Sequence, residues 1–289
     1  MKIRILFILI IAMISVSTSP IIARLLSNVS PISIAFWRMF IGGALLWIFS
    51  LFFKQKPLGK SNRIRTHIFG VLLGLHFFYF FNAVKMTTIS NATFLGTLAP
   101  FFTLLIEMFW LKRKISKNII LCVLLILFGS GIIVIDDFNF SSNYTLGNIY
   151  AIICSLFLGI GFILSEGVRK NETTISFSRT LYMSAAATLF ILSYFLGSSL
   201  IDFQPKDFIG LLILGIVPTL IGHNSLYYAI KYLSPTTIAS VPLGEPIIAS
   251  IIAYFIFDEF SGYQIIISGI IILSGLFYLT NQSREKEII

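Results

Sequence analysis

The chain has 289 residues, of which 57% are hydrophobic and 11% are charged, and its mean hydropathy is +0.94. Soluble domains carry about 25% charged residues, so this composition excludes a soluble globular protein and predicts an all-α polytopic membrane protein in contact with the lipid bilayer. The net charge of +9 does not indicate a nucleic-acid partner, because the basic residues lie in short loops between apolar runs.

Ten apolar runs follow one another along the chain, each near the roughly 17–25 residues that cross a bilayer. We expect spans at about 4–26, 31–53, 66–86, 88–111, 118–135, 147–168, 177–199, 207–230, 235–257 and 262–281. The first run begins with Lys2 and Arg4, as a signal peptide would. It continues past Pro20 and nine more runs follow, so we interpret it as a retained helix.

The basic residues are concentrated on one side of the predicted membrane. With ten spans, both termini lie on the same side. All of the 21 basic residues except Arg24, Arg38, Lys85 and Lys206 fall on that side. The positive-inside rule therefore predicts a multi-pass protein of the inner (cytoplasmic) membrane with both termini in the cytoplasm.

The two halves of the chain align with each other at an offset of 146 residues. The offset places Ala83-Val84-Lys85 on Ala229-Ile230-Lys231, Pro100 on Pro246, and Gly129 on Gly275. We interpret residues 1–140 and 145–289 as two repeats of five spans each. Because five is odd, the second repeat enters the membrane from the opposite side, and such inverted repeats are typical of secondary transporters.

Two segments carry a resemblance to a known family. They are GHNSLYYAIKYLSPTTIASVPLGEPIIASIIAYFIFDE (222–259) and its first-half counterpart NAVKMTTISNATFLGTLAPFFTLLIEMFWLKRKIS (82–116). The chain resembles the ten-helix, EamA-type members of the drug/metabolite transporter superfamily. The resemblance implies two EamA repeats around a central cavity, and a carrier that moves amino acids, other small metabolites or drugs, often outward. In one departure, Lys112-Arg113-Lys114 replaces the acidic residue usual near the end of the fourth helix, whereas Asp258 and Glu259 retain it in the second repeat.

A carboxylate near the middle of the ninth span is the leading candidate for function. Glu245 lies about ten residues from either end of its span, where a charge costs roughly 2.5–3.5 kcal/mol and therefore usually faces a cavity or a partner. Pro242, Gly244 and Pro246 surround it and predict a locally loosened helix. Freed backbone groups at this depth are tolerated where they line water or substrate.

Other polar residues lie at comparable depths. His223 and Asn224 precede a tight hairpin at about the same depth as Glu245, which suggests that His223 and Glu245 share a hydrated cavity and bind substrate, a proton or both. The alternative is that His223 makes a structural hydrogen bond and Glu245 is a neutral acid. Arg38 could meet a substrate carboxylate or phosphate, or extend its charge to the outer surface. The remaining candidates are His76, for which packing is the favoured interpretation, Asn82, and Pro100 as a helix break in the first repeat.

Two further features are given structural interpretations. Glu107 and Glu166 lie near inner helix ends beside basic residues, and we expect solvated ion pairs there. The run HFFYFFN (76–82) carries aromatic residues all round a helix, so it marks no single face as the one that lines a cavity.

These patterns predict a secondary transporter for small polar metabolites or amino acids that works outward by alternating access, with a coupling proton as a candidate partner. The alternative is a flippase of the same superfamily for a lipid carrier or lipid-linked sugar. No HExxH or GxSxG motif indicates an enzyme. Cys122 and Cys154 lie in apolar runs without metal-binding spacing, so we expect no metal and no cofactor. The protein is expected to be a monomer or a homodimer.

Overall fold

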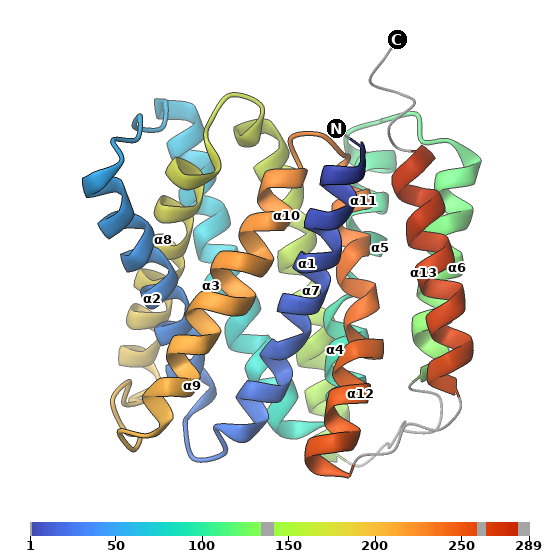
Figure 1. The fold of residues 1–289 in the computed structure, drawn as a ribbon. Helices are drawn as coiled ribbons and strands as arrows, with labels where there is room; N and C mark the ends of the chain where they lie inside the picture. Colours follow the sequence, from blue (N-terminus) through green and yellow to red (C-terminus); the bar gives the residue numbers. More distant parts are fainter. Residues whose placement is uncertain (1, 134–141, 259–263, 283–289) are drawn as a thin grey trace.

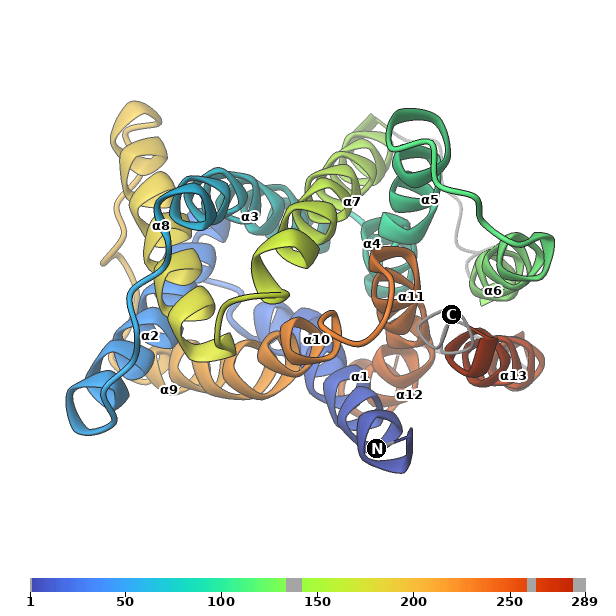
Figure 2. The same cartoon turned by 90° about the horizontal axis from the view of Figure 1, so that it is seen from above.

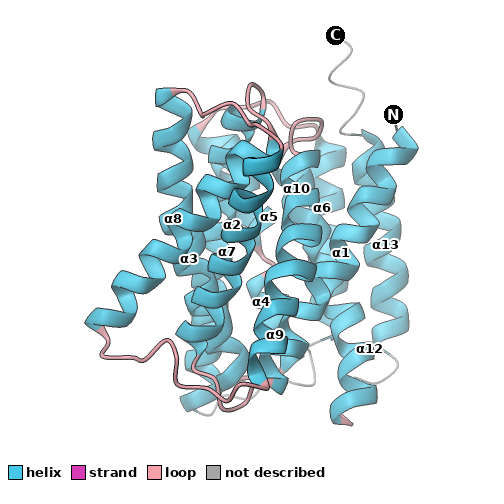
Figure 3. Cartoon of the chain, turned by 60° about the vertical axis from the view of Figure 1, so that its left-hand side comes forward, coloured by secondary structure: helices cyan, strands magenta, loops and turns pink. Residues whose placement is uncertain are grey.

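The computed structural model describes residues 2–133, 142–258 and 264–282. Within these ranges all regular secondary structure is helical (Figure 3), which confirms the predicted all-α membrane fold. Glu259, which belongs to the acidic helix end predicted from the resemblance, lies outside the described residues.

The helices follow the two halves of the sequence. The first half contains α1 (Lys2–Leu25), α2 (Pro31–Phe52), α3 (Lys60–Met86), α4 (Ile89–Gly96), α5 (Ala99–Leu105), η1 (Ile106–Trp110) and α6 (Lys117–Ile133). The second half contains α7 (Ser142–Arg169), α8 (Thr174–Phe195), α9 (Asp207–Leu214), η2 (Gly215–His223), α10 (Asn224–Ala229), α11 (Pro235–Ser240), η3 (Val241–Gly244), α12 (Glu245–Phe257) and α13 (Gln264–Gln282).

These elements form the ten expected spans. Among the described residues, 8 helical stretches are long and apolar enough to cross a membrane, and two shorter apolar helices lie at Lys117–Ile132 and Ile266–Gln282. Three of the spans, Ile89–Trp110, Asp207–Ala229 and Pro235–Phe257, are composite, because each joins consecutive segments of different helical geometry. The start of α1 and the end of α13 lie at the same end of the bundle (Figure 1).

We call that end the basic face; it carries the connections 53–59, 111–116, 170–173 and 230–234. The other end, with the connections 26–30 and 196–206, is the opposite face. Large apolar side chains are exposed on the outer helix surfaces, for example Phe195 at 78% and Phe255 at 78%. In a membrane protein these surfaces face lipid.

The helix pairs reflect the inverted repeat. α2 packs against α8, α5 against α11, and α6 against α13, so each of these spans contacts its own counterpart in the other half. The contact of α1 with η2 and α10 is matched by that of α7 with α3. Seen from the basic face, α6 and α13 form one edge of the molecule, and α2 and α8 lie toward the other (Figure 2). This pairing is the one expected of two five-helix units related by a two-fold axis in the membrane plane.

Local sequence explains where the repeated spans begin and how closely they pack. The Thr88 side chain caps α4 by accepting a hydrogen bond from the backbone N–H of Asn91, and Ser234, which lies 146 residues later, caps α11 in the same way. On α3, Gly70 lies against α8, where an added Cβ would stand 2.3 Å from the Cβ of Ser184 and 3.1 Å from the carbonyl oxygen of Leu181. The close approach of these two helices therefore requires glycine.

Candidate functional site

Two composite spans break at the same depth, and the breaks are related by the repeat. α4 ends at Gly96, and α5 begins at Ala99 with Pro100 in its first turn. In the other half, α11 passes through the 3-10 helix η3 into α12, which has Pro246 in its first turn. Proline has no N–H to donate, so it fits the start of a helix and interrupts a continuous one. Both breaks leave backbone groups near the centre of the bundle.

Neighbouring side chains hold the broken segments in place. The hydroxyl of Ser130 on α6 donates to the carbonyl oxygen of Leu243 in η3 at 3.0 Å. In the first half, the Thr97 hydroxyl donates to the carbonyl oxygen of Thr93 at 2.8 Å. The Thr93 carbonyl also accepts a hydrogen bond from the backbone N–H of Thr97 at 2.9 Å. Of these two hydroxyl groups, only that of Ser130, at the break in the second half, therefore supplies a donor from a neighbouring helix to the broken segment, as expected where water is scarce.

A small central cavity lies between the two breaks. It is lined from both halves of the chain by Val16, Ser19, Arg38, His76, Phe77, Phe80, Gly96, Thr97, Leu158, His223, Pro242 and Glu245. The volume in which the centre of a water molecule can lie is about 30 Å³. A single water needs roughly 10–15 Å³ by this measure, so the cavity admits a few waters but no metabolite. We call this arrangement, with its small cavity, the contracted conformation of the site.

Arg38 is the cation of this cavity, and it is 1% exposed. Its Nε donates to the Thr219 hydroxyl at 2.9 Å, and its Nη1 donates to the Ser19 hydroxyl at 2.6 Å. The guanidinium carbon lies 4.0 Å from the centre of the Phe77 ring. The remaining nitrogen, Nη2, is buried without a hydrogen-bond partner among the described residues. The hydroxyl groups and the ring fix the side chain and leave the N–H groups of Nη2 for another molecule.

Glu245 is the acidic residue of the same cavity, and it is 5% exposed. Within the described ranges its carboxyl group accepts no hydrogen bond, and it interacts with Arg38 electrostatically rather than through a direct ion pair. A buried carboxyl group and a buried guanidinium thus share a cavity, and each has unused hydrogen-bonding capacity. Buried charges normally have partners, so this arrangement is incomplete without water or a ligand.

Both predicted histidines line the cavity with Glu245. His223 ends the π-helix η2; its Nδ1 lies 3.5 Å from the Tyr227 hydroxyl, and its ring contacts Phe77 at 5.4 Å between centroids. The Nδ1 atom of His76 lies 2.8 Å from the backbone carbonyl oxygen of Cys154. The packing interpretation of His76 and its place in the cavity are therefore compatible, because one ring nitrogen is engaged while the residue lines the cavity.

The two predicted asparagines lie elsewhere. Asn82 donates through Nδ2 to the carbonyl oxygen of Phe78, one turn earlier on α3, at 2.7 Å. Asn224 accepts a hydrogen bond from the Tyr182 hydroxyl at 3.0 Å. Neither residue lines the cavity. Of the predicted helix-breaking residues, Pro242 lines the cavity directly, while Gly244, Pro246 and Pro100 belong to the adjoining breaks.

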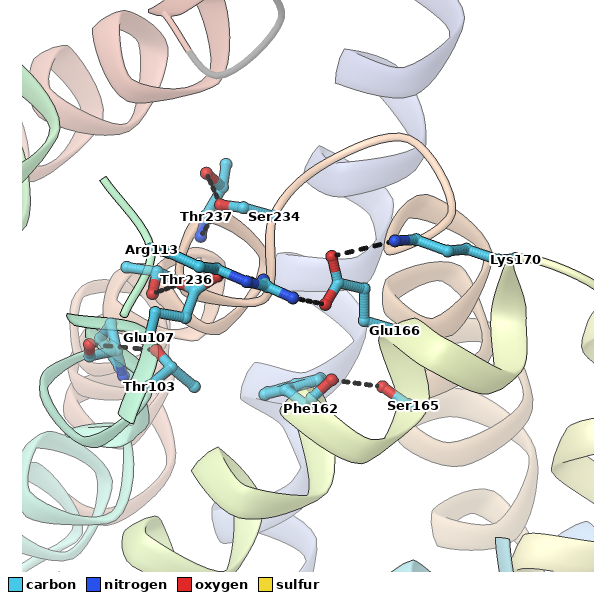
Figure 4. Close-up of polar contacts among 11 residues, drawn as sticks. Thr103, Glu107, Arg113, Phe162, Ser165, Glu166, Lys170, Ser234, Thr236 and Thr237 are labelled. Carbon is cyan, nitrogen blue, oxygen red and sulfur yellow. Dashed lines mark hydrogen bonds and ion pairs between the residues drawn. The ribbon is translucent and has the colours of Figure 1, made fainter. Parts of the chain in front are cut away.

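The expectation of solvated ion pairs at the inner helix ends is wrong for Glu107, which is 2% exposed. Its Oε1 pairs with Arg113 Nη1 at 2.6 Å, and its Oε2 accepts a hydrogen bond from the Thr236 hydroxyl (Figure 4). Arg113 Nη2 pairs in turn with Glu166 Oε2 at 2.7 Å. The position of Glu107 three residues before Trp110 gave no indication of this burial, because the covering Thr236 comes from the other half of the chain.

Arg113 keeps its charge in this network. Partial burial disfavours the cation, but hydrogen bonds to Glu166 and Glu107 outweigh that effect and raise the pKa of Arg113 above its usual value.

No pattern in the sequence indicated Ser19 and Thr219, the hydroxyl partners of Arg38 in the central cavity. Single hydroxyl residues in apolar spans are common, so only the three-dimensional arrangement distinguishes them.

Comparison with known proteins agrees with this architecture. A solved crystal structure superimposes with a TM-score of 0.76 over 98% of this chain and 99% of that chain at 18% identity, which supports the fold. An uncharacterized transporter from Archaeoglobus fulgidus is 25% identical over 251 residues, covering 85% of each chain. An S-adenosylmethionine uptake transporter from Rickettsia bellii is 24% identical over 95% of this chain and 92% of its own. A pseudopaline exporter, CntI, from Pseudomonas aeruginosa is 22% identical over 71% of this chain and 70% of its own.

The sequence model of one family matches both halves of the chain, at residues 2–135 and 145–281. This match covers nearly all of the sequence, and its two segments fall on the two five-helix units described above. The protein therefore belongs to the EamA-like transporter family, within the drug/metabolite transporter superfamily.

Proposed function

We propose that this protein is a secondary transporter that moves small zwitterionic metabolites, such as amino acids, outward across the cytoplasmic membrane by alternating access. Glu245 and Arg38 form its substrate site, and Glu245 also carries the coupling proton. The basic face lies in the cytoplasm, as the positive-inside rule predicts.

One observation carries the choice of substrate class. The buried Nη2 of Arg38 has no hydrogen-bond partner among the described residues, and the Glu245 carboxyl shares its cavity. A carboxylate is the natural ligand of a guanidinium, and an ammonium group is the natural partner of a buried carboxylate. A molecule that carries both groups would satisfy both charges at once, whereas a neutral solute would leave each of them unpaired.

The size of the cavity supports alternating access. Because the cavity of about 30 Å³ admits water only, substrate binding requires the two halves to move apart on one side. The inverted repeat provides that movement, since an exchange of conformation between the halves switches the open face. When the site is empty, protonation of Glu245 would remove one of the two charges, which is the property that a proton-coupled carrier needs.

The relatives include an exporter and an uptake transporter, so the test measures both directions. Purified protein in proteoliposomes is supplied with single radiolabelled amino acids, with and without an inward or outward pH gradient. We expect accumulation of a subset of amino acids that depends on the gradient. Glu245→Gln should abolish the response to the gradient. Asn82→Ala, a change outside the cavity, serves as the matched control and should transport normally.

The substrate class is tested separately by thermal stability. A bound amino acid should raise the melting temperature of the purified protein, whereas its methyl ester and its decarboxylated amine should not. Arg38→Gln should abolish the preference for the free acid over the ester. Equal stabilisation by acid and ester would contradict the role of Arg38. If no solute moves and lipid-linked sugars are translocated instead, the flippase alternative replaces this proposal.

A further inference from the structure

A charged cluster joins the two halves of the protein at the basic face. Arg113 lies between two carboxylates: Glu107, from its own half, and Glu166, from the other half, at 2.6 and 2.7 Å. The Thr236 hydroxyl, also from the other half, donates to the second oxygen of Glu107 (Figure 4). Two of these contacts, Arg113–Glu166 and Glu107–Thr236, therefore cross between the halves.

The backbone places Arg113 where it bridges them. At the end of η1 the chain turns back through Lys112, whose φ of 51° lies in the left-handed region that few non-glycine residues adopt. The backbone N–H of Arg113 then donates to the carbonyl oxygen of Glu107 at 2.8 Å. From this turn the guanidinium reaches Glu166 on α7 at 2.7 Å.

The elements that meet at this cluster also line the central cavity. Thr97 of the first break, Leu158 of α7 and Pro242 of η3 all contact the cavity. At 1.5 Å per residue, Glu107 lies about 15 Å from Thr97 along its span, and Glu166 about 12 Å from Leu158 along α7. The cluster thus connects three walls of the cavity at the point where they reach the basic face.

A hollow beside the cluster would become the access route. It has a volume of about 220 Å³ and is lined by residues that include Glu107, Arg113, Glu166, Lys231 and Thr236. This volume is far larger than that of the central cavity, and the ion pairs lie in its wall. Any separation of α5 from α7 and α11 toward this face must break the contacts that cross between the halves.

We propose that Arg113 is the latch of a gate at the basic face, and that the central cavity opens to this side when its contact with Glu166 and the Glu107–Thr236 hydrogen bond break. The inference rests on the alternating access of the proposed function, but it requires no knowledge of the substrate. Arg113 is in this sense a positioning residue, since it controls access and does not touch the bound molecule.

The test measures access to the cavity by chemical labelling. Cys122 and Cys154 are replaced by serine, and Thr97→Cys places a reporter in the cavity lining. Membrane-impermeant methanethiosulfonates of positive and of negative charge are applied to vesicles of each orientation. Arg113→Gln should increase the labelling rate from the basic face about tenfold with both reagents, and should not increase labelling from the opposite face.

Lys170→Gln is the matched control, because it removes one positive charge from the same hollow while breaking only an exposed contact of 3.8 Å with Glu166. It should leave the labelling rate within about twofold of the parent. Glu166→Gln and Thr236→Val each remove one contact between the halves, so each should raise the labelling rate from the basic face. If Arg113→Gln does not fold, these two variants take its place in the test. Unchanged labelling in these variants, or an equal rise with Lys170→Gln, would overturn the proposal. If the labelling rates change as expected but no amino acid is transported, the gate at Arg113 is supported and the proposed substrate class is wrong.

Discussion

The charges of Arg38 and Glu245 can be tested without a substrate, through a double-mutant cycle of Arg38→Gln and Glu245→Gln. Each single change leaves one buried charge without its partner, and the loss of one member of a buried pair typically costs about 3–5 kcal/mol. The double change removes both charges and should cost less than the sum of the two. The shortfall is the interaction energy of the pair.

The expected size of that interaction follows from the structure. Two unit charges 4 Å apart attract each other by about 4 kcal/mol at an effective dielectric constant of about 20. Arg38 and Glu245 interact across the cavity without a direct ion pair, so we expect about 2 kcal/mol, or roughly 30-fold in the unfolding equilibrium. Arg38→Gln also removes hydrogen bonds to Thr219 and Ser19. Those losses occur with and without Glu245 and cancel in the cycle.

The assay is reversible unfolding of the purified protein in mixed micelles, titrated with a denaturing detergent and followed by tryptophan fluorescence. The chain has 3 tryptophans as reporters. Additivity of the two changes within about 0.5 kcal/mol would refute the reasoning. It would show that Glu245 is uncharged in the contracted conformation and that its role is that of a neutral structural acid.

Two further predictions concern the framework of the site, and both use the same unfolding assay. Gly70→Ala should destabilise the protein by about 1–3 kcal/mol because the new methyl group forces α3 away from α8. The methyl group added by Gly269→Ala has no neighbour closer than 3.9 Å, so this variant should be as stable as the parent or more stable by up to about 1 kcal/mol. Similar losses of stability in both glycine variants would contradict the packing argument.

The second prediction is that Ser130→Ala should cost about 1–2 kcal/mol because a carbonyl of η3 loses its donor. Ser268→Ala is the control, because it removes a buried hydroxyl that has no hydrogen-bond partner among the described residues. If it lowers stability as much as Ser130→Ala does, the hydrogen bond to η3 does not account for the loss.

The spans and the repeat could be predicted from the sequence because both depend on pattern along the chain. Apolar run length fixes the spans, and the offset of 146 residues relates Pro100 to Pro246, where both breaks lie. The shared depth of His223 and Glu245 could be read from the helix rise in the same way, and both residues line the cavity.

The rotation of each helix about its axis could not be predicted, and this explains the remaining differences. Asn82 lies on a helix with aromatic residues all round, so no stripe marked the face that it occupies, and it does not reach the cavity. Glu107 is near basic residues in the sequence, which favoured a solvated position. Its burial depends on Thr236 from the other half of the chain, a contact that no local pattern encodes.

The cluster around Arg113 makes the two ends of the molecule chemically unequal. At the 146-residue offset Glu107 corresponds to Ala253, which is buried and has no charge. At the opposite face, one contact between the halves is a neutral hydrogen bond, in which the Trp37 indole N–H donates to the carbonyl oxygen of Leu200 at 2.7 Å. Salt screens exposed charges more than buried ones, so raised ionic strength should weaken the Arg113–Glu166 pair, which is more exposed than the Arg113–Glu107 pair. In the proposed transport cycle it should therefore speed opening toward the basic face. In the proposed cycle such asymmetry cannot drive net flux, which still needs a gradient, but it would make the two reorientation steps differ in rate.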